Sequence, residues 1–228
     1  MSSSLVFAEQ VLPAGSNQSV SESATLSNST NCVQIADGPE LSIQSEVSPM
    51  SPGTVTVYGF WAFAEEDELN VRPAKNTKVE LWDSDLGGLI NTLLDTTYTD
   101  LQGNYEFAPV DNNDGPFEDG FDIYVKIFTE GDVVWVSDAG GSVYCASTSC
   151  VSNVPDGRYN MSAWAVIGDA SRAMAIYDTM LLGYRYAKYS VGYSHGRVHA
   201  VWPSGGTGTD TLSPLTIYIA GWSRLTIR

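Results

Sequence analysis

The stretch GYSHG, residues 192–196, places Ser194 in the G-x-S-x-G pattern of hydrolase nucleophiles. That pattern needs a strand before the serine and a helix after it, which together hold the hydroxyl on a sharp turn. Here a helical pattern comes before Ser194 and a strand-like pattern after it, and His199 precedes the only later acid, Asp210. Hydrolases of this type have the acid before the histidine. The context favours a turn between helix and strand, and a serine hydrolase that uses Ser194 is kept as an alternative.

The two histidines, His195 and His199, have the H-x-x-x-H spacing of a zinc-binding helix. Gly196 stands where such helices carry the glutamate that acts as general base. If the segment is a strand, residues four apart lie about 13 Å from each other, which is too far to share one zinc ion. His199 is therefore expected to be an ordinary strand residue. We expect neither bound zinc nor hydrolytic activity from this chain alone.

A cluster of carboxylates lies in the segment DNNDGPFEDGFD. Calcium takes six to eight oxygen ligands, and acidic loops can supply them. The spacing departs from that of an EF-hand loop, because Gly115 comes one position early and the bidentate glutamate is absent from its place. Calcium binding and a solvated loop between strands both stay open. The candidate calcium ligands are Asp111, Asp114, Glu118, Asp119 and Asp122.

The chain has three cysteines, two of which lie close together in the segment CASTSC. In an oxidising compartment a bridge across such a short loop would contribute about 2 kcal/mol. Zinc ligation would require further cysteines or histidines nearby, and none follow. The spacing predicts a structural disulfide between Cys145 and Cys150 and leaves Cys32 unpaired.

The charge of the chain is one-sided, with 27 acidic and 11 basic residues and a net charge of −16. Such a surface repels phosphate backbones and anionic lipids, so nucleic acid is excluded as an expected partner. No apolar run is long enough to span a bilayer. The partners that stay open are a protein or a polysaccharide, and no cofactor other than calcium is indicated.

Several features of the sequence favour export. Val6 and Ala8 fit the −3 and −1 positions of a signal-peptide cleavage site, although the charged and apolar regions that normally precede it are missing. Three sequons, at Asn17, Asn28 and Asn160, agree with secretion. The chain is therefore expected to be secreted or to lie on the extracellular surface.

Six strand-like segments follow one another from Thr54 to about Asp138, separated by turn-rich sequences such as DSDLGG and DLQG. No helical period occurs between them, which predicts an antiparallel sandwich or barrel. In TTYTDLQGNYEF, Gly103 is expected to close a tight turn through a positive φ. The side chains expected inside are those of Val79, Leu81, Tyr105, Phe107, Ile123 and Val125.

The sequence NTKVELWDSD…LLDTTYTDLQGNYEF…GFDIYVKIF resembles the transthyretin-like or carboxypeptidase-regulatory-like modules. These share a V-x-L-x-D … T-D-x-x-G-x-Y/F-x-F pattern, which here covers roughly residues 54–138. The resemblance implies a small prealbumin-like sandwich that is an appended, non-catalytic part of a secreted or surface protein. The Lys–Asn isopeptide bonds of related adhesin repeats are not implied, since the first strand-like segment, TVTVYGFWAF, has no lysine.

After about residue 157 the period of the apolar residues changes to three- and four-residue steps. This predicts an amphipathic helix that is capped by Asn160 or Ser162, weakened by Gly168 and ended by Gly183. Two apolar strand-like segments, RVHAVWP and LTIYIAGW, follow it. We therefore expect a flexible leader (1–53), a β-sandwich (54–140), a connector (141–157) and an incomplete α/β unit (158–228). The predicted class is mainly β: a small antiparallel prealbumin-like sandwich followed by a helix and two strands.

The order of elements over residues 154–228 is similar to the opening of secreted zinc metallopeptidase-type domains. In those domains a helix carrying H-E-x-x-H comes later, and this sequence contains no such motif. The first hypothesis is thus an exported multidomain protein whose sandwich is a non-catalytic spacer or binding module, joined to the first part of a metallopeptidase-like domain. The alternatives are a complete non-catalytic surface or adhesion protein and the Ser194 hydrolase.

Overall fold

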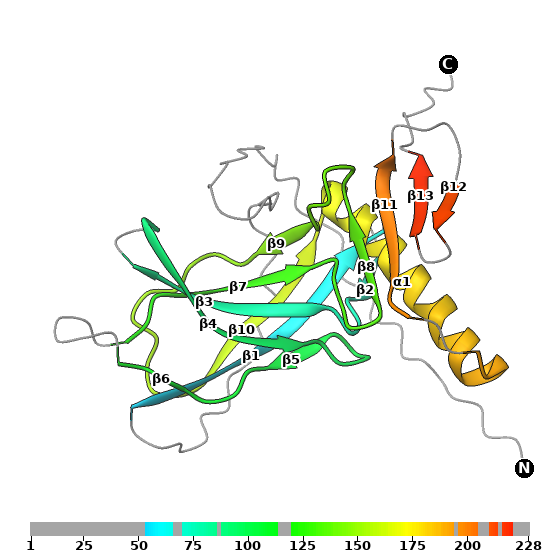
Figure 1. Cartoon of the computed structure of the whole chain (residues 1–228). Coiled ribbons are helices and arrows are strands. Elements are labelled where there is room, and N and C mark those ends of the chain that lie inside the picture. The colour runs from blue at the N-terminus through cyan, green and yellow to red at the C-terminus, as the bar shows by residue number, and fades with distance from the viewer. Residues whose placement is uncertain are drawn as a thin grey trace, which may run out of the picture.

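The structure is a computed structural model, and it describes residues 53–220 except for 66–69, 86–87, 114–119, 194–195, 205–209 and 214–215. This part of the chain is mainly β, as predicted, with three sheets and one α helix (Figure 1). None of the helices in it is long and apolar enough to cross a lipid bilayer.

The first sheet is organised around the long strand β1, which pairs with four other strands. The alternation of β1 places Val55 and Val57 fully inside. The β1 sheet consists of β10 (Gly157–Val166), β1 (Thr54–Ala64), β2 (Val71–Pro73), β5 (Asn104–Glu106) and β6 (Val110–Asp111).

The second sheet shares one hydrophobic core with the first, so the two form a sandwich. All six side chains predicted to be internal are buried, and the most exposed of them, Tyr105, is only 4% exposed. The second sheet has the order β4 (Ile90–Tyr98), β3 (Lys78–Asp85), β7 (Ile123–Phe128) and β9 (Cys145–Ser147).

The turn at Gly103 has the predicted conformation, with a φ of +86°. A Cβ atom at this position would lie 2.5 Å from the carbonyl oxygen of Trp61, so the glycine also permits a close approach to β1. The carboxylate of Asp100 accepts hydrogen bonds from the backbone of Gln102 and Asn104. The turn therefore holds β5 against β1, and its role is architectural.

The third sheet lies beside the sandwich and is covered on one face by helix α1 (Gly168–Tyr186), which continues into the short π helix η1 (Ala187–Val191). Side chains from α1 such as Met174 and Tyr177 enter the same core as the sandwich. The third sheet has the order β12 (Asp210–Ser213), β13 (Thr216–Ala220), β11 (Val198–Ser204) and β8 (Val134–Ser137).

Two features of the topology differ from the prediction. Strand β8 was expected to complete the sandwich, but it pairs in parallel with β11 of the third sheet. The segment expected to be a connector supplies β9, which pairs with β7. Residue 140 is thus no boundary between separate sheets, and the sandwich and the helix–sheet unit share strands and core.

The predicted start of the helix was wrong. Asn160 and Ser162 lie in β10, which pairs in parallel with β1, so the sandwich is not wholly antiparallel. Ser162 has a φ of +66° at an irregularity in this pairing, which interrupts the alternation and makes the segment look helical in sequence. The helix begins at Gly168, whose backbone also has a positive φ of 65°.

The predicted bridge between Cys145 and Cys150 is not formed. Cys150 carries a free, exposed thiol. Cys145 is buried and disulfide-bonded, so its partner is not Cys150. Cys32 lies outside the described residues.

The reason is the extended course of the chain between the two cysteines. Cys145 lies opposite Phe128, and Val151 lies opposite Ile123, so the segment runs along β7. Five residues of extended chain span about 16 Å, whereas a disulfide requires Cα atoms within about 7 Å. A short sequence interval therefore did not mean a short distance.

Candidate functional site

The two faces of the third sheet differ in chemistry. Alternate residues of β8 and β11, such as Val134, Val136 and Ala200, are fully buried in the core. The intervening residues lie on the opposite face, because side chains alternate along a strand. Parallel pairing sets His199 opposite Trp135 on this second face.

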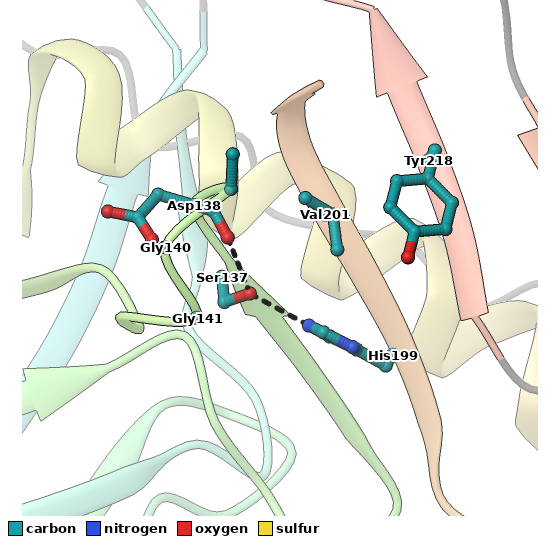
Figure 2. A pocket seen from close by; sticks show the side chains of 8 residues that line it. Ser137, Asp138, Gly140, Gly141, His199, Val201 and Tyr218 are labelled. Carbon is teal, nitrogen blue, oxygen red and sulfur yellow. Dashed lines mark hydrogen bonds between the residues drawn. The ribbon is translucent and has the colours of Figure 1, made fainter. Parts of the chain in front are cut away.

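A pocket of about 370 Å³ opens on this face where β8 ends (Figure 2). The chain leaves the sheet there in a tight turn, closed by a hydrogen bond from the Ser142 N–H to the carboxylate of Asp138 at 2.9 Å. Strands β11 and β13 continue beyond this point and form the opposite wall. The pocket is lined by Ser137, Asp138, Ala139, Gly140, Gly141, His199, Val201 and Tyr218.

A short side-chain contact in the pocket joins Ser137 Oγ and His199 Nε2, at 2.8 Å. The same hydroxyl donates its single proton to the backbone carbonyl of Asp138 at 2.9 Å. The histidine must then donate its Nε2 hydrogen to the serine oxygen, which leaves Nδ1 as an acceptor. Ser137 therefore fixes both the orientation and the tautomer of the imidazole.

The surroundings of His199 favour its neutral form. Its ring stacks on Trp135 with centroids 4.3 Å apart and planes 8° from parallel. Arg197 lies over the same indole at 4.4 Å. Burial, and secondly the positive charge of Arg197, lower the pKa of His199 below its ordinary value. The imidazole is thus uncharged at neutral pH and can take part in hydrogen bonding without carrying charge.

This arrangement resembles a nucleophile–base pair only in its composition. Ser137 has no exposed area, and its proton is directed at a carbonyl instead of at the histidine. A general base must accept the proton of the nucleophile that it activates. The geometry favours binding over acyl transfer, with His199 and the half-buried Tyr218 as the side chains that a ligand would meet.

Most of the residues that the sequence singled out lie outside the part of the chain that the structure describes. Ser194 and His195 lie outside the described residues, as do Asp114, Glu118 and Asp119 of the candidate calcium loop. Of the other two candidate calcium ligands, Asp111 belongs to β6, and Asp122 accepts a hydrogen bond from the Asn153 N–H. Within the described ranges no three acidic, cysteine or histidine side chains are grouped to hold a metal.

Sequence reasoning missed the serine and the turn beside it. The sequence pattern predicts Ser137 and Asp138 as the end of an ordinary strand, and His199 as an isolated strand residue. The available signal was the order Ser-Asp-Ala-Gly-Gly directly after an apolar strand, which places polar groups at a strand end before a tight turn. Nothing in the sequence indicated that β11 would lie next to β8.

Comparison with known proteins adds little to this geometry. No family model and no curated protein matches the sequence. Among solved structures, a 9R-lipoxygenase from Cyanothece PCC8801 is similar over 56% of this chain at 19% identity, with a TM-score of 0.35. This chain spans 19% of the length of that protein. A likeness this loose assigns neither a fold family nor an activity.

Proposed function

We propose that this chain is a non-catalytic binding module of an exported or cell-surface protein, and that its ligand enters the pocket between the β8 turn and strands β11 and β13. The observation that carries the proposal is the Ser137–His199 contact, which holds an imidazole in one tautomer at a pocket wall. A few fixed polar groups in a concave site are typical of small-molecule binding.

The sandwich gives this pocket a rigid support. Glu130 forms ion pairs with Lys78 of β3 at 2.8 Å and with Arg197 at 2.7 Å. Arg197 in turn stacks on Trp135, the ring that carries His199. The β8 and β11 side of the pocket is thereby tied to the sandwich, which fits a scaffold better than a passive spacer.

The lining favours a neutral, hydroxyl-bearing ligand such as a sugar residue at the end of a polysaccharide. His199 and Tyr218 offer ring faces together with one acceptor and one hydroxyl. Asp138 adds a carboxylate, and the net charge of −16 repels anions. Apolar ligands would leave these polar groups without partners, at a cost for each buried group.

Intrinsic tryptophan fluorescence provides the test, because Trp135, one of the six tryptophans of the chain, stacks directly on His199. Titration with neutral oligosaccharides (maltohexaose, cellohexaose and chitohexaose) should give a saturable change for at least one of them. The change should be lost in His199→Ala and kept in the control Tyr186→Ala, a site 65% exposed on α1. Silence toward all three, or equal responses from both variants, would rule out this ligand class at the pocket.

A second proposal is that residues 154–228 belong to a metallopeptidase-like domain. The order of a long helix followed by β11 and β13 agrees with the expected order of elements. The reading frame beyond Arg228 tests this proposal: an H-E-x-x-H helix within a few dozen residues supports it. Its absence there would leave the surface or adhesion protein as the better description.

A further inference from the structure

Cys145 lies on the outer face of the second sheet, at the start of strand β9. It pairs with Phe128 of β7, next to the pair of Ile127 and Ala146, which belong to the core. Because side chains alternate along a strand, Cys145 and Phe128 point away from that core. Among the described strands β9 pairs only with β7, yet Cys145 is only 1% exposed. An outward-facing cysteine on this strand is therefore covered.

The cover extends over the neighbouring strand. All six residues of β7 are buried, although a strand of an antiparallel sandwich usually has one solvated face. Lys78 provides part of the cover, with its ammonium group 4.4 Å from the ring centroid of Phe128. On the opposite side of the sheet the first half of β4 is exposed. The covered part of the outer face thus lies on the β9 side of the sheet.

Counting the cysteines identifies a partner for this site. The chain has three, Cys32, Cys145 and Cys150. Cys145 is disulfide-bonded, whereas Cys150 carries a free thiol. Because a cysteine forms one disulfide, the partner left within the chain is Cys32. A bond between two chains is disfavoured, since Cys145 is too deeply buried to meet the same residue of a second copy.

The length of the chain between Cys32 and the sandwich permits the bond. Gly53 is 21 positions after Cys32, and its N–H donates a hydrogen bond to the carboxylate of Asp156 at 2.7 Å. An extended chain of this length reaches about 70 Å. A compact domain of this size is about 40 Å across. Cys32 can therefore reach β9 while Gly53 stays at the start of β1.

We propose that Cys32 and Cys145 form a disulfide, and that the segment around Cys32 thereby covers the outer face of β7 and β9. Formation of the bond removes two protons and two electrons from the two thiols. A small-molecule or protein disulfide accepts them and becomes two thiols. Such a bond persists in an oxidising compartment, which agrees with the proposed export. The inference does not rest on the pocket.

The bond would close a loop of 113 positions that contains strands β1 to β8. Closing a loop of this length lowers the entropy of the unfolded chain and so favours the folded state. The N-terminal segment would then be an anchored part of the sandwich.

Counting thiols in the full chain tests the pairing. The protein is refolded with reduced glutathione in excess over oxidised glutathione, then denatured without reductant and titrated with dithionitrobenzoate. The parent should show one thiol, Cys32→Ser two and Cys150→Ser none. A Cys145–Cys150 bond would instead give none in Cys32→Ser and two in Cys150→Ser. That result, or three thiols in the parent, would overturn the proposal.

Peptide mapping identifies the bonded residues directly. Residues 1–53 contain neither lysine nor arginine, so the unreduced protein is alkylated and then cut with a protease that cleaves after acidic residues. The digest should contain the Cys32 peptide joined to the Cys145 peptide, with the alkyl group on Cys150. A link between two Cys145 peptides, seen also as a dimer on a non-reducing gel, would contradict the assignment.

Thermal unfolding measures what the bond contributes. Cys32→Ser should lower the melting temperature by about 5–15 °C, because the unfolded chain is no longer closed into a loop. The matched control Cys150→Ser should change it by less than about 2 °C. Reductant should lower the melting temperature of the parent to that of Cys32→Ser and leave the variant unchanged. Equal melting temperatures of the unreduced parent and Cys32→Ser would show that the segment is not anchored in this way.

Discussion

The interior of the sandwich and the outward face of the third sheet are built from the same kind of strand but serve different ends. In the sandwich, residues near in sequence alternate around turns and bury apolar side chains such as Phe107. On the third sheet, segments more than sixty residues apart bring Ser137 to His199 (|i−j| of 62). The alternation of apolar residues along neighbouring strands therefore determines the core of the sandwich. The candidate site instead depends on the pairing of strands that lie far apart in the sequence.

The largest expected effect tests the sandwich side of this comparison. Phe107 is 2% exposed, and Phe107→Ala should lower the free energy of unfolding by about 3–5 kcal/mol through lost burial and a cavity. Urea denaturation of the full chain measures it. A loss below about 1 kcal/mol would mean that Phe107 is not part of a close-packed core.

A smaller loss is expected where the sandwich meets the helix. Asp178 of α1 is 7% exposed and forms ion pairs with Arg72 at 2.7 Å and Lys75 at 3.3 Å. Both cations are partly exposed, so Asp178→Asn should cost about 1–2 kcal/mol by thermal or urea unfolding. Asp169→Asn is the control. The carboxylate of Asp169 is 69% exposed, so loss of its ion pair with Arg172 should hardly change the free energy of unfolding. Equal losses of stability in the two variants would contradict a stabilising role for the ion pairs of Asp178 between the sandwich and the helix.

The pocket side should be sensitive to pH. The folded-state pKa of His199 is lowered from 6.5, so the unfolded chain binds the proton more readily. The contribution to stability is complete above about pH 6.5 and is lost as the pH falls through the folded pKa. At pH 5 we expect the free energy of unfolding to be lower by less than about 1 kcal/mol on account of His199, as measured by urea unfolding. His199→Gln should reduce this decrease, and an unchanged pH profile would contradict the assignment.

The smallest effect concerns Cys150. Its thiol is exposed and free, so Cys150→Ser should change the free energy of unfolding by less than about 0.5 kcal/mol. In the folded, unreduced protein a maleimide should label Cys150 and spare Cys145, as mass spectrometry of peptides can show. Labelling of Cys145, or recovery of a Cys145–Cys150 bridge, would contradict the structure.

The sequence predicted well those features that depend on residues close together in the chain. The inward positions of β3, β5 and β7 and the turn at Gly103 follow from alternation and from a residue able to take positive φ. The sequence predicted poorly where pairing with a distant strand determines the secondary structure. The pattern around Asn160 predicts a helix, but this segment belongs to β10, which pairs with β1. The pocket could not be predicted either, because Ser137 and His199 are ordinary residues until the parallel β8–β11 pairing sets them together.

The pairing of β1 with β10 has a consequence for how the protein is made. Gly53 and Asp156, at the start of this pairing, are hydrogen-bonded although they are 103 positions apart. During synthesis from the N-terminus β1 emerges first. The edge of β1 that pairs with β10 stays unpaired until β10 has also been synthesised. Contacts of such long range slow folding, because a large loop must close before they form. A nascent chain that stops before Gly157 would therefore expose a long apolar edge, and chaperone protection would matter most during this interval on the ribosome.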